Sequence, residues 1–208
     1  MTTGHLFIIS APSGTGKSLL LKLLLKNNKF KFNIKLSISY TTRIKRTGEV
    51  DNEDYFFISK KKFQTMIKNN EFLEYAKVFG NYYGTSKKNI NNMLQNNTDI
   101  FLNIDWQGAK QVRKKIPQVC SIFILPPSIE ELYKRLNLRG KDHIDIINKR
   151  ILQSKKEIYH FYEYDYLIIN NNINDAKFDL QNIIYAEHLK IKTQFNIYNN
   201  FINKLLNE

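Results

Sequence analysis

The sequence of 208 residues contains a single cysteine, Cys120, which excludes a framework of disulfide bonds and any cysteine-based zinc site. No apolar run reaches the ~18–20 residues that a membrane-spanning helix needs. The first residues, MTTGH, carry no basic segment, so they lack the pattern of a secretory signal peptide. Apolar residues make up 42% of the chain, which is too many for a disordered protein. We therefore expect a folded, soluble, cytoplasmic protein with no membrane partner.

Acidic residues are few, 19 against 32 basic ones, and the net charge is +13. Such a charge can indicate a polyanionic partner such as nucleic acid. Lysine and asparagine are spread over the whole chain without a basic stripe, so we favour a compositional bias and expect no specific nucleic-acid partner. Only 6 of the basic residues are arginine. Because a guanidinium can grip two phosphate oxygens and a lysine cannot, these six are candidate phosphate contacts. They are Arg43, Arg46, Arg113, Arg135, Arg139 and Arg150.

Short apolar runs alternate with helical patterns along the chain, which predicts an α/β fold with a parallel sheet. The apolar runs that predict core strands are residues 6–10, 34–39, 100–105, 119–125 and 166–170. Shorter strands are predicted at 55–58 and 72–78. The predicted helices are 17–26, 60–68, 86–96, 128–140 (opened by a capping box), about 142–162, and 175–206 as one long helix or two.

The chain shows no internal repeat and no linker, so we expect one domain over residues 1–208. Residues 34–97 differ from the rest, with short strands, many tyrosines and polar turns, and they read as an inserted subdomain. Residues 128–159 are charged and interrupted by Arg139-Gly140-Lys141, which suits a mobile lid. The predicted core consists of 1–33, 98–127 and 160–208.

A phosphate-binding P-loop follows the first predicted strand and leads directly into a helix. Its residues are Ala11, Pro12, Ser13, Gly14, Thr15, Gly16, Lys17 and Ser18. The glycine turn points backbone N–H groups into one concavity, and the helix N-terminus adds partial positive charge. Lys17 would reach the β- and γ-phosphates of a nucleoside triphosphate, and the Ser18 hydroxyl would ligate Mg²⁺. Ala11 stands where the pattern usually has glycine. A chance Gly-Lys-Ser turn is the alternative, and the flanking strand and helix argue against it.

The P-loop alone predicts only that a nucleoside triphosphate binds. A GTPase would need a base-recognising Asn-Lys-x-Asp on a later strand, which the sequence lacks, and a motor or transporter ATPase would need more length. Further motifs follow at 37–50 (SISYTTRIKRTGEV), 54–57 (DYFF), 72–75 (FLEY), 80–85 (GNYYGT) and 105–108 (DWQG). In this order and spacing the chain closely resembles the guanylate kinase family, from about residue 5 to about residue 190.

The resemblance implies a P-loop NTPase-type parallel sheet flanked by helices, an inserted mixed α/β subdomain that binds GMP, and a helical lid. The implied reaction is ATP + GMP ⇌ ADP + GDP, with Mg²⁺ as cofactor and dGMP as a second acceptor. The nucleophile is a phosphate oxygen already ionised at pH 7, so catalysis needs positioning and positive charge rather than a general base. The four histidines lie outside every motif, and we expect surface or structural roles for them. They are His5, His143, His160 and His188.

By similarity, Arg43 and Arg46 would hold the GMP phosphate, helped by the hydroxyls of Tyr55 and Tyr83. A carboxylate at Glu74 would accept hydrogen bonds from guanine N1–H and the exocyclic amine, whereas adenine would leave it unpaired. The expected GMP-binding residues are Ser39, Arg43, Arg46, Tyr55, Glu74, Tyr83, Gly84, Thr85 and Asp105, with Ser39 and Thr85 at the O6 side of guanine. Out of context, the tyrosines would be ordinary core residues and the others ordinary surface residues.

The predicted lid supplies further cations by similarity. Arg135 and Arg139 lie four apart on one helix face, and Arg150 follows on the next helix. These arginines would reach the transferring phosphoryl group, and lid closure would exclude water; a solvated basic helix is the alternative. The expected catalytic residues are Lys17, Arg43, Arg135, Arg139 and Arg150.

Two polar residues at strand ends complete the expected nucleotide site. Asp105 would orient Mg²⁺ through water, and Asn170 would contact the adenine of ATP. The family usually has an aspartate where this chain has Asn103, which argues against a direct metal or base contact at that position.

Three other functions stay open at this point. A non-catalytic guanylate-kinase-like interaction module of the scaffolding type would typically have lost P-loop and lid residues that are present here. A nucleic-acid binder would use the net charge of +13, and a kinase for a different nucleoside monophosphate would use the same core. The sequence also leaves a homo-oligomer possible.

Overall fold

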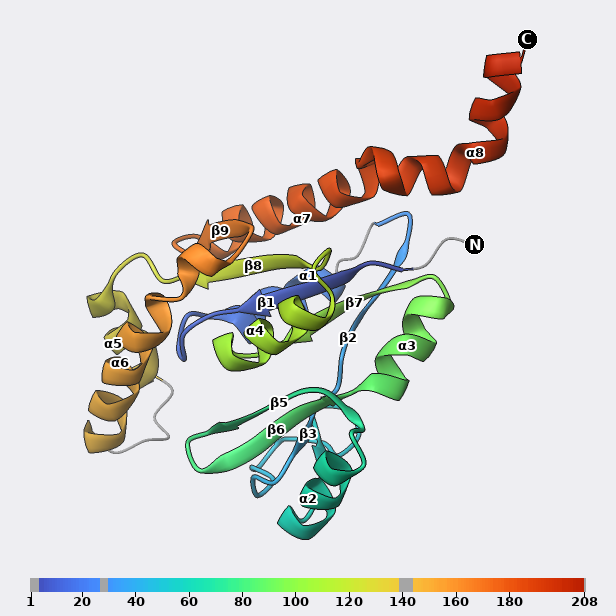
Figure 1. Ribbon diagram of the computed structural model, residues 1–208. Helices are drawn as coiled ribbons and strands as arrows, with labels where there is room; N and C mark the ends of the chain where they lie inside the picture. The colour runs from blue at the N-terminus through green and yellow to red at the C-terminus, as the bar shows by residue number, and fades with distance from the viewer. Residues whose placement is uncertain (1–3, 27–29, 139–143, 208) are drawn as a thin grey trace.

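The computed structural model describes residues 4–26, 30–138 and 144–207. Figure 1 shows a central sheet covered by helices and a smaller sheet beside it. The central sheet has five parallel strands in the order β2-β7-β1-β8-β9. They are β1 (Leu6–Ser10), β2 (Asn33–Leu36), β7 (Thr98–Asn103), β8 (Cys120–Leu125) and β9 (Tyr166–Ile169). The predicted α/β fold with a parallel sheet flanked by helices is confirmed.

The middle strands β7, β1 and β8 are buried on both faces, as their near-continuous apolar runs predict. Side chains along β1 alternate between two hydrophobic clusters. Phe7 and Ile9 pack in a cluster with α1 and α7, whereas Leu6 and Ile8 pack with α3 and α4. The bounds of these helices are α1 (Lys17–Lys26), α3 (Lys87–Gln95), α4 (Trp106–Lys115) and α7 (Ile173–Leu189). Two helical layers therefore leave the strand ends as the accessible part of the middle of the sheet.

The second sheet has four strands in the order β4-β3-β6-β5 and mixes parallel with antiparallel pairs. Its strands are β3 (Tyr40–Thr41), β4 (Phe56–Phe57), β5 (Phe72–Val78) and β6 (Asn81–Ser86). Helix α2 (Lys60–Lys68) packs Phe63 and Met66 against Phe72, which gives this sheet a small core of its own. The expected subdomain boundary at residue 34 falls inside β2, which pairs with β7 in the central sheet.

Helices α5 (Ile129–Leu138) and α6 (Ile144–Ile158) form a pair on the side of the molecule opposite the C-terminal helix α8 (Ile191–Asn207) (Figure 1). Leu132, Leu136 and Ile147 make a hydrophobic cluster between them. The hydroxyl of Ser128 accepts a hydrogen bond from the backbone N–H of Glu131 at 3.1 Å, as the capping sequence predicts. A 3₁₀ turn at Phe161–Glu163 leads back to the sheet.

Among the described residues, one helix and two strands were not predicted from the sequence patterns: α4, β6 and the two-residue strand β3. Helix α4 buries a narrow stripe, Gly108, Ala109 and Val112, and carries a polar surface elsewhere, so its apolar periodicity is weak. Strand β6 reads NYYGTS, a polar segment that pairs with β5 and β3. The C-terminal region forms two helices, α7 and α8, which meet at Lys190. No helix in the described ranges is both long enough and apolar enough to cross a bilayer.

We expect Phe101→Ala to lower the free energy of unfolding by about 3–5 kcal/mol, the usual cost of a cavity left by a buried phenylalanine. Phe101 is fully buried in β7, and its ring lies 5.5 Å from that of Phe7. Phe178→Ala is the matched control, because Phe178 is 62% exposed on α7. Urea unfolding of both variants measures the difference, and equal losses would contradict this account of the core.

Candidate functional site

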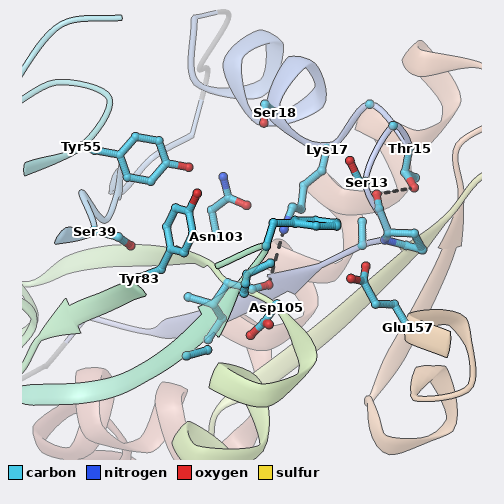
Figure 2. A pocket seen from close by; sticks show the side chains of 18 of the residues that line it. Ser13, Thr15, Lys17, Ser18, Ser39, Tyr55, Tyr83, Asn103, Asp105 and Glu157 are labelled. Atoms are coloured by element: carbon cyan, nitrogen blue, oxygen red, sulfur yellow. Dashed lines mark hydrogen bonds between the residues drawn. The ribbon is translucent and has the colours of Figure 1, made fainter. Parts of the chain in front are cut away.

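A cavity of about 270 Å³ lies where the carboxyl ends of β1 and β7 approach the second sheet. Ligands of open parallel sheets bind at this edge. The cavity is lined by residues 11–18, Ser39, Tyr55, Glu74, Ala76, Val78, Phe79, Tyr83, Asn103, Ile104, Asp105 and Glu157. Figure 2 shows Tyr55 and Tyr83 on one side of Lys17, with Ser13, Thr15 and Glu157 on the other. The cavity thus joins the glycine-rich loop to the second sheet.

The loop after β1 has the conformation that an anion site requires. Gly14 and Gly16 have φ values of 93° and 94°, in the left-handed region where side chains are strained. The Thr15 hydroxyl donates to the carbonyl of Pro12 at 2.8 Å. The side-chain amide of Asn170, at the end of β9, donates to the carbonyl of Thr15 at 2.7 Å. Asn170 is buried and holds the loop in place through this hydrogen bond.

Lys17 lies on the first turn of α1 and places its amine over the strand ends. Its Nζ is 3.3 Å from the carbonyl oxygen of Ile9 and 3.4 Å from that of Ile104. Burial lowers the pKa of Lys17 to about 8, although the nearby carboxylates of Asp105 and Glu157 oppose the change. An anion in the cavity would favour the charged amine. Lys17 is thus a desolvated cation aimed at the centre of the cavity.

Asp105 ends the turn after β7 and caps α4. Its Oδ1 accepts the backbone N–H of Gly108 at 2.9 Å, and its Oδ2 accepts the side-chain amide of Gln107 at 3.0 Å. Each carboxylate oxygen has a second lone pair, so Asp105 keeps acceptor capacity toward the cavity. Together with the Ser18 hydroxyl it provides hard oxygen donors, which suit Mg²⁺ when waters or phosphate oxygens supply the other ligands.

Glu74 projects from β5 and is 3% exposed. The Thr85 hydroxyl donates to its Oε1 at 2.6 Å. A Cβ at Gly108 would lie only 2.4 Å from its Oε2, so this glycine leaves the space that the carboxylate occupies. Burial raises the pKa of Glu74 to about 7, although the hydrogen bond from Thr85 opposes the rise. The partners of the carboxylate do not offset the cost of burying its charge. A ligand that brings two N–H donors would therefore suit it.

The loop before β4 holds two expected phosphate ligands around Glu49. Arg43 donates to the Glu49 carboxylate at 2.6 Å, and its guanidinium lies 5.5 Å from the ring centre of Tyr55. The backbone N–H of Arg46 donates to the same carboxylate at 2.8 Å. The rings of Tyr55 and Tyr83 meet edge to face at 5.9 Å. The two tyrosines line the cavity, whereas the Arg43 guanidinium lies outside its lining and is paired with Glu49.

Arg135 on α5 connects the helical pair to the glycine-rich loop. Its Nη1 donates to the carbonyl of Thr15 at 3.2 Å and to that of Asn170 at 3.1 Å. Its Nε donates to Glu131 one turn earlier, at 2.9 Å. This arginine is therefore fixed against the backbone of the loop.

Helix α6 contacts the far side of the cavity. The Arg150 guanidinium lies 5.9 Å from the ring centre of Phe79, in the turn between β5 and β6. Glu157 lines the cavity from the end of α6, and burial raises its pKa. Arg139 and His143, singled out in the sequence, lie outside the described residues.

The structure brings most of the expected set into one cavity: the loop at 11–18, Ser39, Tyr55, Glu74, Tyr83 and Asp105. The remaining described members lie outside its lining: Arg43, Arg46, Gly84, Thr85, Arg135, Arg150 and Asn170. Gly84 has a packing role, because a Cβ there would lie 2.9 Å from Phe72. Phe79 and Glu157 were not expected. Glu157 lies on the buried face of α6 together with Ile147 and Ser154. A carboxylate on the buried face of a predicted helix is a sequence signal that could have identified it as a site residue.

Comparison with known proteins gives one consistent result. The sequence profile described as "Guanylate kinase" matches residues 3–187. A guanylate kinase of Buchnera aphidicola subsp. Baizongia pistaciae is 57% identical over 208 residues, the full length of both chains. One of Salmonella typhimurium is 50% identical over 206 residues and 99% of each chain. The crystal structure of guanylate kinase from Anaplasma phagocytophilum superposes with a TM-score of 0.74 at 34% identity, covering 92% of this chain and 89% of that one.

We expect Glu74→Gln to stabilise the protein at alkaline pH. Because folding raises the pKa of Glu74 from 4.5 to about 7, the native state binds this proton more tightly than the unfolded state. Its contribution to stability is then present below pH 4.5 and lost as the pH rises toward 7. Glutamine removes that dependence. The difference in free energy of unfolding between variant and wild type should therefore grow by about 2–3 kcal/mol from pH 5 to pH 8, in favour of the variant. Denaturant unfolding at both pH values measures this gain. Glu71→Gln, at an exposed carboxylate nearby, is the control, and an equal gain there would contradict the assignment.

Proposed function

Because the chain belongs to the guanylate kinase family and is an ATP:GMP phosphotransferase, we propose that ATP binds at its P-loop while GMP binds against the second sheet. The γ-phosphoryl group then passes from ATP to GMP to give ADP and GDP, and dGMP serves as a second acceptor. The observation that supports this arrangement is a single cavity with Lys17 on one wall and the buried Glu74 carboxylate on another. The first is suited to phosphate and the second to a guanine edge.

On the donor side, the backbone N–H groups of the P-loop and the Lys17 amine bind the phosphates of ATP. Ser18 and, through water, Asp105 would hold Mg²⁺, which neutralises charge on the transferring phosphoryl group. Asn170 and Arg135 act on this side by fixing the loop through the Thr15 carbonyl. One N–H of the Asn170 amide donates to the loop, and a contact of this amide with the adenine of ATP stays a prediction.

On the acceptor side, the Glu74 carboxylate accepts hydrogen bonds from guanine N1–H and the exocyclic amine. Adenine presents an acceptor at N1 and no such amine, so it would leave a buried carboxylate unpaired. Thr85 holds Oε1 of Glu74 and so orients the carboxylate. The Ser39 hydroxyl also lines the cavity, and in this proposal it donates to O6 of guanine.

The GMP phosphate lies against Tyr55 and Tyr83 in this proposal, with Arg43 and Arg46 as its cations. When GMP binds, the Arg43 guanidinium leaves the Glu49 carboxylate and pairs with the phosphate. Both anions can accept two parallel hydrogen bonds from its planar group. The pair with Glu49 holds the guanidinium close to Tyr55 before GMP arrives.

Transfer itself depends on position and charge. The attacking phosphate oxygen is already ionised, so no side chain has to remove a proton. Lys17 stabilises the charge that develops on the transferred group. Residues 128–159 act as the lid that excludes water and brings Arg139 and Arg150 toward that group.

A coupled assay with ATP, Mg²⁺ and each of GMP, dGMP, AMP, UMP and CMP tests acceptor choice. Glu74→Gln should raise KM for GMP by about 10- to 100-fold, the range for losing a hydrogen bond to a charged group, with KM for ATP nearly unchanged. Glu71→Gln is the matched control. Equal losses for both nucleotides, or turnover of AMP by the wild-type enzyme at the rate of GMP, would contradict the proposed base recognition.

We expect Lys17→Ala to lower kcat by at least about 10²–10³-fold, because it removes a preorganised cation from the developing charge. GMP should still bind, since its proposed contacts lie on the second sheet. Steady-state kinetics and calorimetric titration with GMP separate the two effects. Lys22→Ala, at an exposed lysine on the same helix, serves as the control, and retained turnover in Lys17→Ala would refute the role given to this amine.

A further inference from the structure

Two histidines and an aspartate meet at the end of the central sheet opposite the cavity. His5 immediately precedes β1, Asp99 is the second residue of β7, and His188 lies in the last turn of α7. The P-loop follows the carboxyl end of β1, whereas His5 and Asp99 lie at the amino ends of β1 and β7, where His188 contacts Asp99. Figure 1 shows the start of β1 and the end of α7 on the same side, away from α5 and α6. The cluster is therefore separate from the nucleotide site.

The potential ligand atoms of this cluster converge. One ligand atom from each of His5, Asp99 and His188 lies within 4.8 Å of the other two. Nε2 of His188 is 2.6 Å from Oδ2 of Asp99, and Nδ1 of His5 is 3.4 Å from Oδ1. Asp99 is 1% exposed, and a buried carboxylate requires a cationic or hydrogen-bonding partner.

The contacts of His5 favour the tautomer that carries its proton on Nε2. The Thr193 hydroxyl donates to the backbone carbonyl of Glu187 at 3.4 Å, so its oxygen accepts the Nε2–H of His5 at 3.1 Å. Nδ1 of His5 is then a bare lone pair. It is buried and has no hydrogen-bond partner among the described residues. An unpaired nitrogen thus faces a carboxylate oxygen, and a cation between them would satisfy both.

The surroundings hold the two imidazoles in place. The His188 ring stacks on Phe32 with centroids 3.7 Å apart and planes 16° apart. The backbone N–H of His5 donates to Oδ1 of Asp99 at 2.7 Å, which fixes the carboxylate. Thr193 orients the His5 ring through its other nitrogen, as the outer partners of metal-binding histidines do.

We propose that His5, Asp99 and His188 bind one divalent transition-metal ion of the zinc class. Two imidazole nitrogens and one carboxylate oxygen suit Zn²⁺, Co²⁺ or Ni²⁺, whereas Mg²⁺ prefers oxygen ligands alone. Three protein ligands leave a fourth position for water. The ion would take the place of the hydrogen between Nε2 of His188 and Asp99; a neutral His188 then carries its one proton on Nδ1, whereas an imidazolium loses one proton to solvent. The ion would join the N-terminus, β7 and α7, so its role is structural rather than catalytic.

Calorimetric titration with ZnCl₂ tests the proposal, using tag-free protein that has been treated with EDTA and kept in excess Mg²⁺. The wild type should bind one Zn²⁺ that Mg²⁺ does not displace, and its Tm should rise with Zn²⁺ because the ion binds the folded state. His5→Asn and His188→Gln should lose this binding event. Thr193→Ala should weaken it by about 10–100-fold, as loss of an outer-shell partner does.

His160→Gln is the matched control, because His160 stacks on Trp106 away from the cluster and its loss should leave zinc binding unchanged. Substitution with Co²⁺ adds a signature, a visible absorption band in the wild type that the His5 and His188 variants lack. Guanylate kinase activity in every variant verifies that each one folds, and it does not depend on this site. Absence of zinc binding in the wild type, or its retention in both ligand variants, would overturn the proposal.

Discussion

The burial of β7, β1 and β8 on both faces is the constraint on which the rest of this structure depends. Two layers of helices exclude water from the middle of the sheet, so polar side chains gather where the strands end. At the carboxyl ends these are the P-loop, Asn103 and Asp105. At the amino ends they are His5 and Asp99. One packing arrangement therefore creates two separate polar sites.

Glu74 shows how the site opposes the stability of the fold. The carboxylate is buried, and although the hydroxyl and backbone of Thr85 donate to it, burial still raises its pKa to about 7. An apolar or amide side chain would be easier to bury there. In the proposed function this burial makes the carboxylate selective, because a guanine edge would supply further N–H donors and an adenine edge would not. The proposed selectivity would thus come from a carboxylate whose burial costs the fold stability.

Local signals were enough to predict the P-loop, the core strands and most of the helices, because apolar runs, glycines and caps act within a few residues. Helix α4 and strand β6 were missed, since their stability comes from packing against β5 rather than from their own apolar pattern. The pairing of Arg43 with Glu49 and the arrival of Phe79 and Glu157 at the cavity depend on tertiary contacts. The roles of the GMP-binding residues came from resemblance to a family, and spacing alone would not have assigned them.

Gly108 has a consequence for how this sequence can change. Gly108 is the third residue of α4, and within a helix alanine is normally more stable than glycine by about 1 kcal/mol. At this position any side chain would enter the volume that the Glu74 carboxylate fills. A side chain at position 108 would therefore displace the Glu74 carboxylate. In the proposed function it would weaken base recognition, although residue 108 itself need not contact the nucleotide.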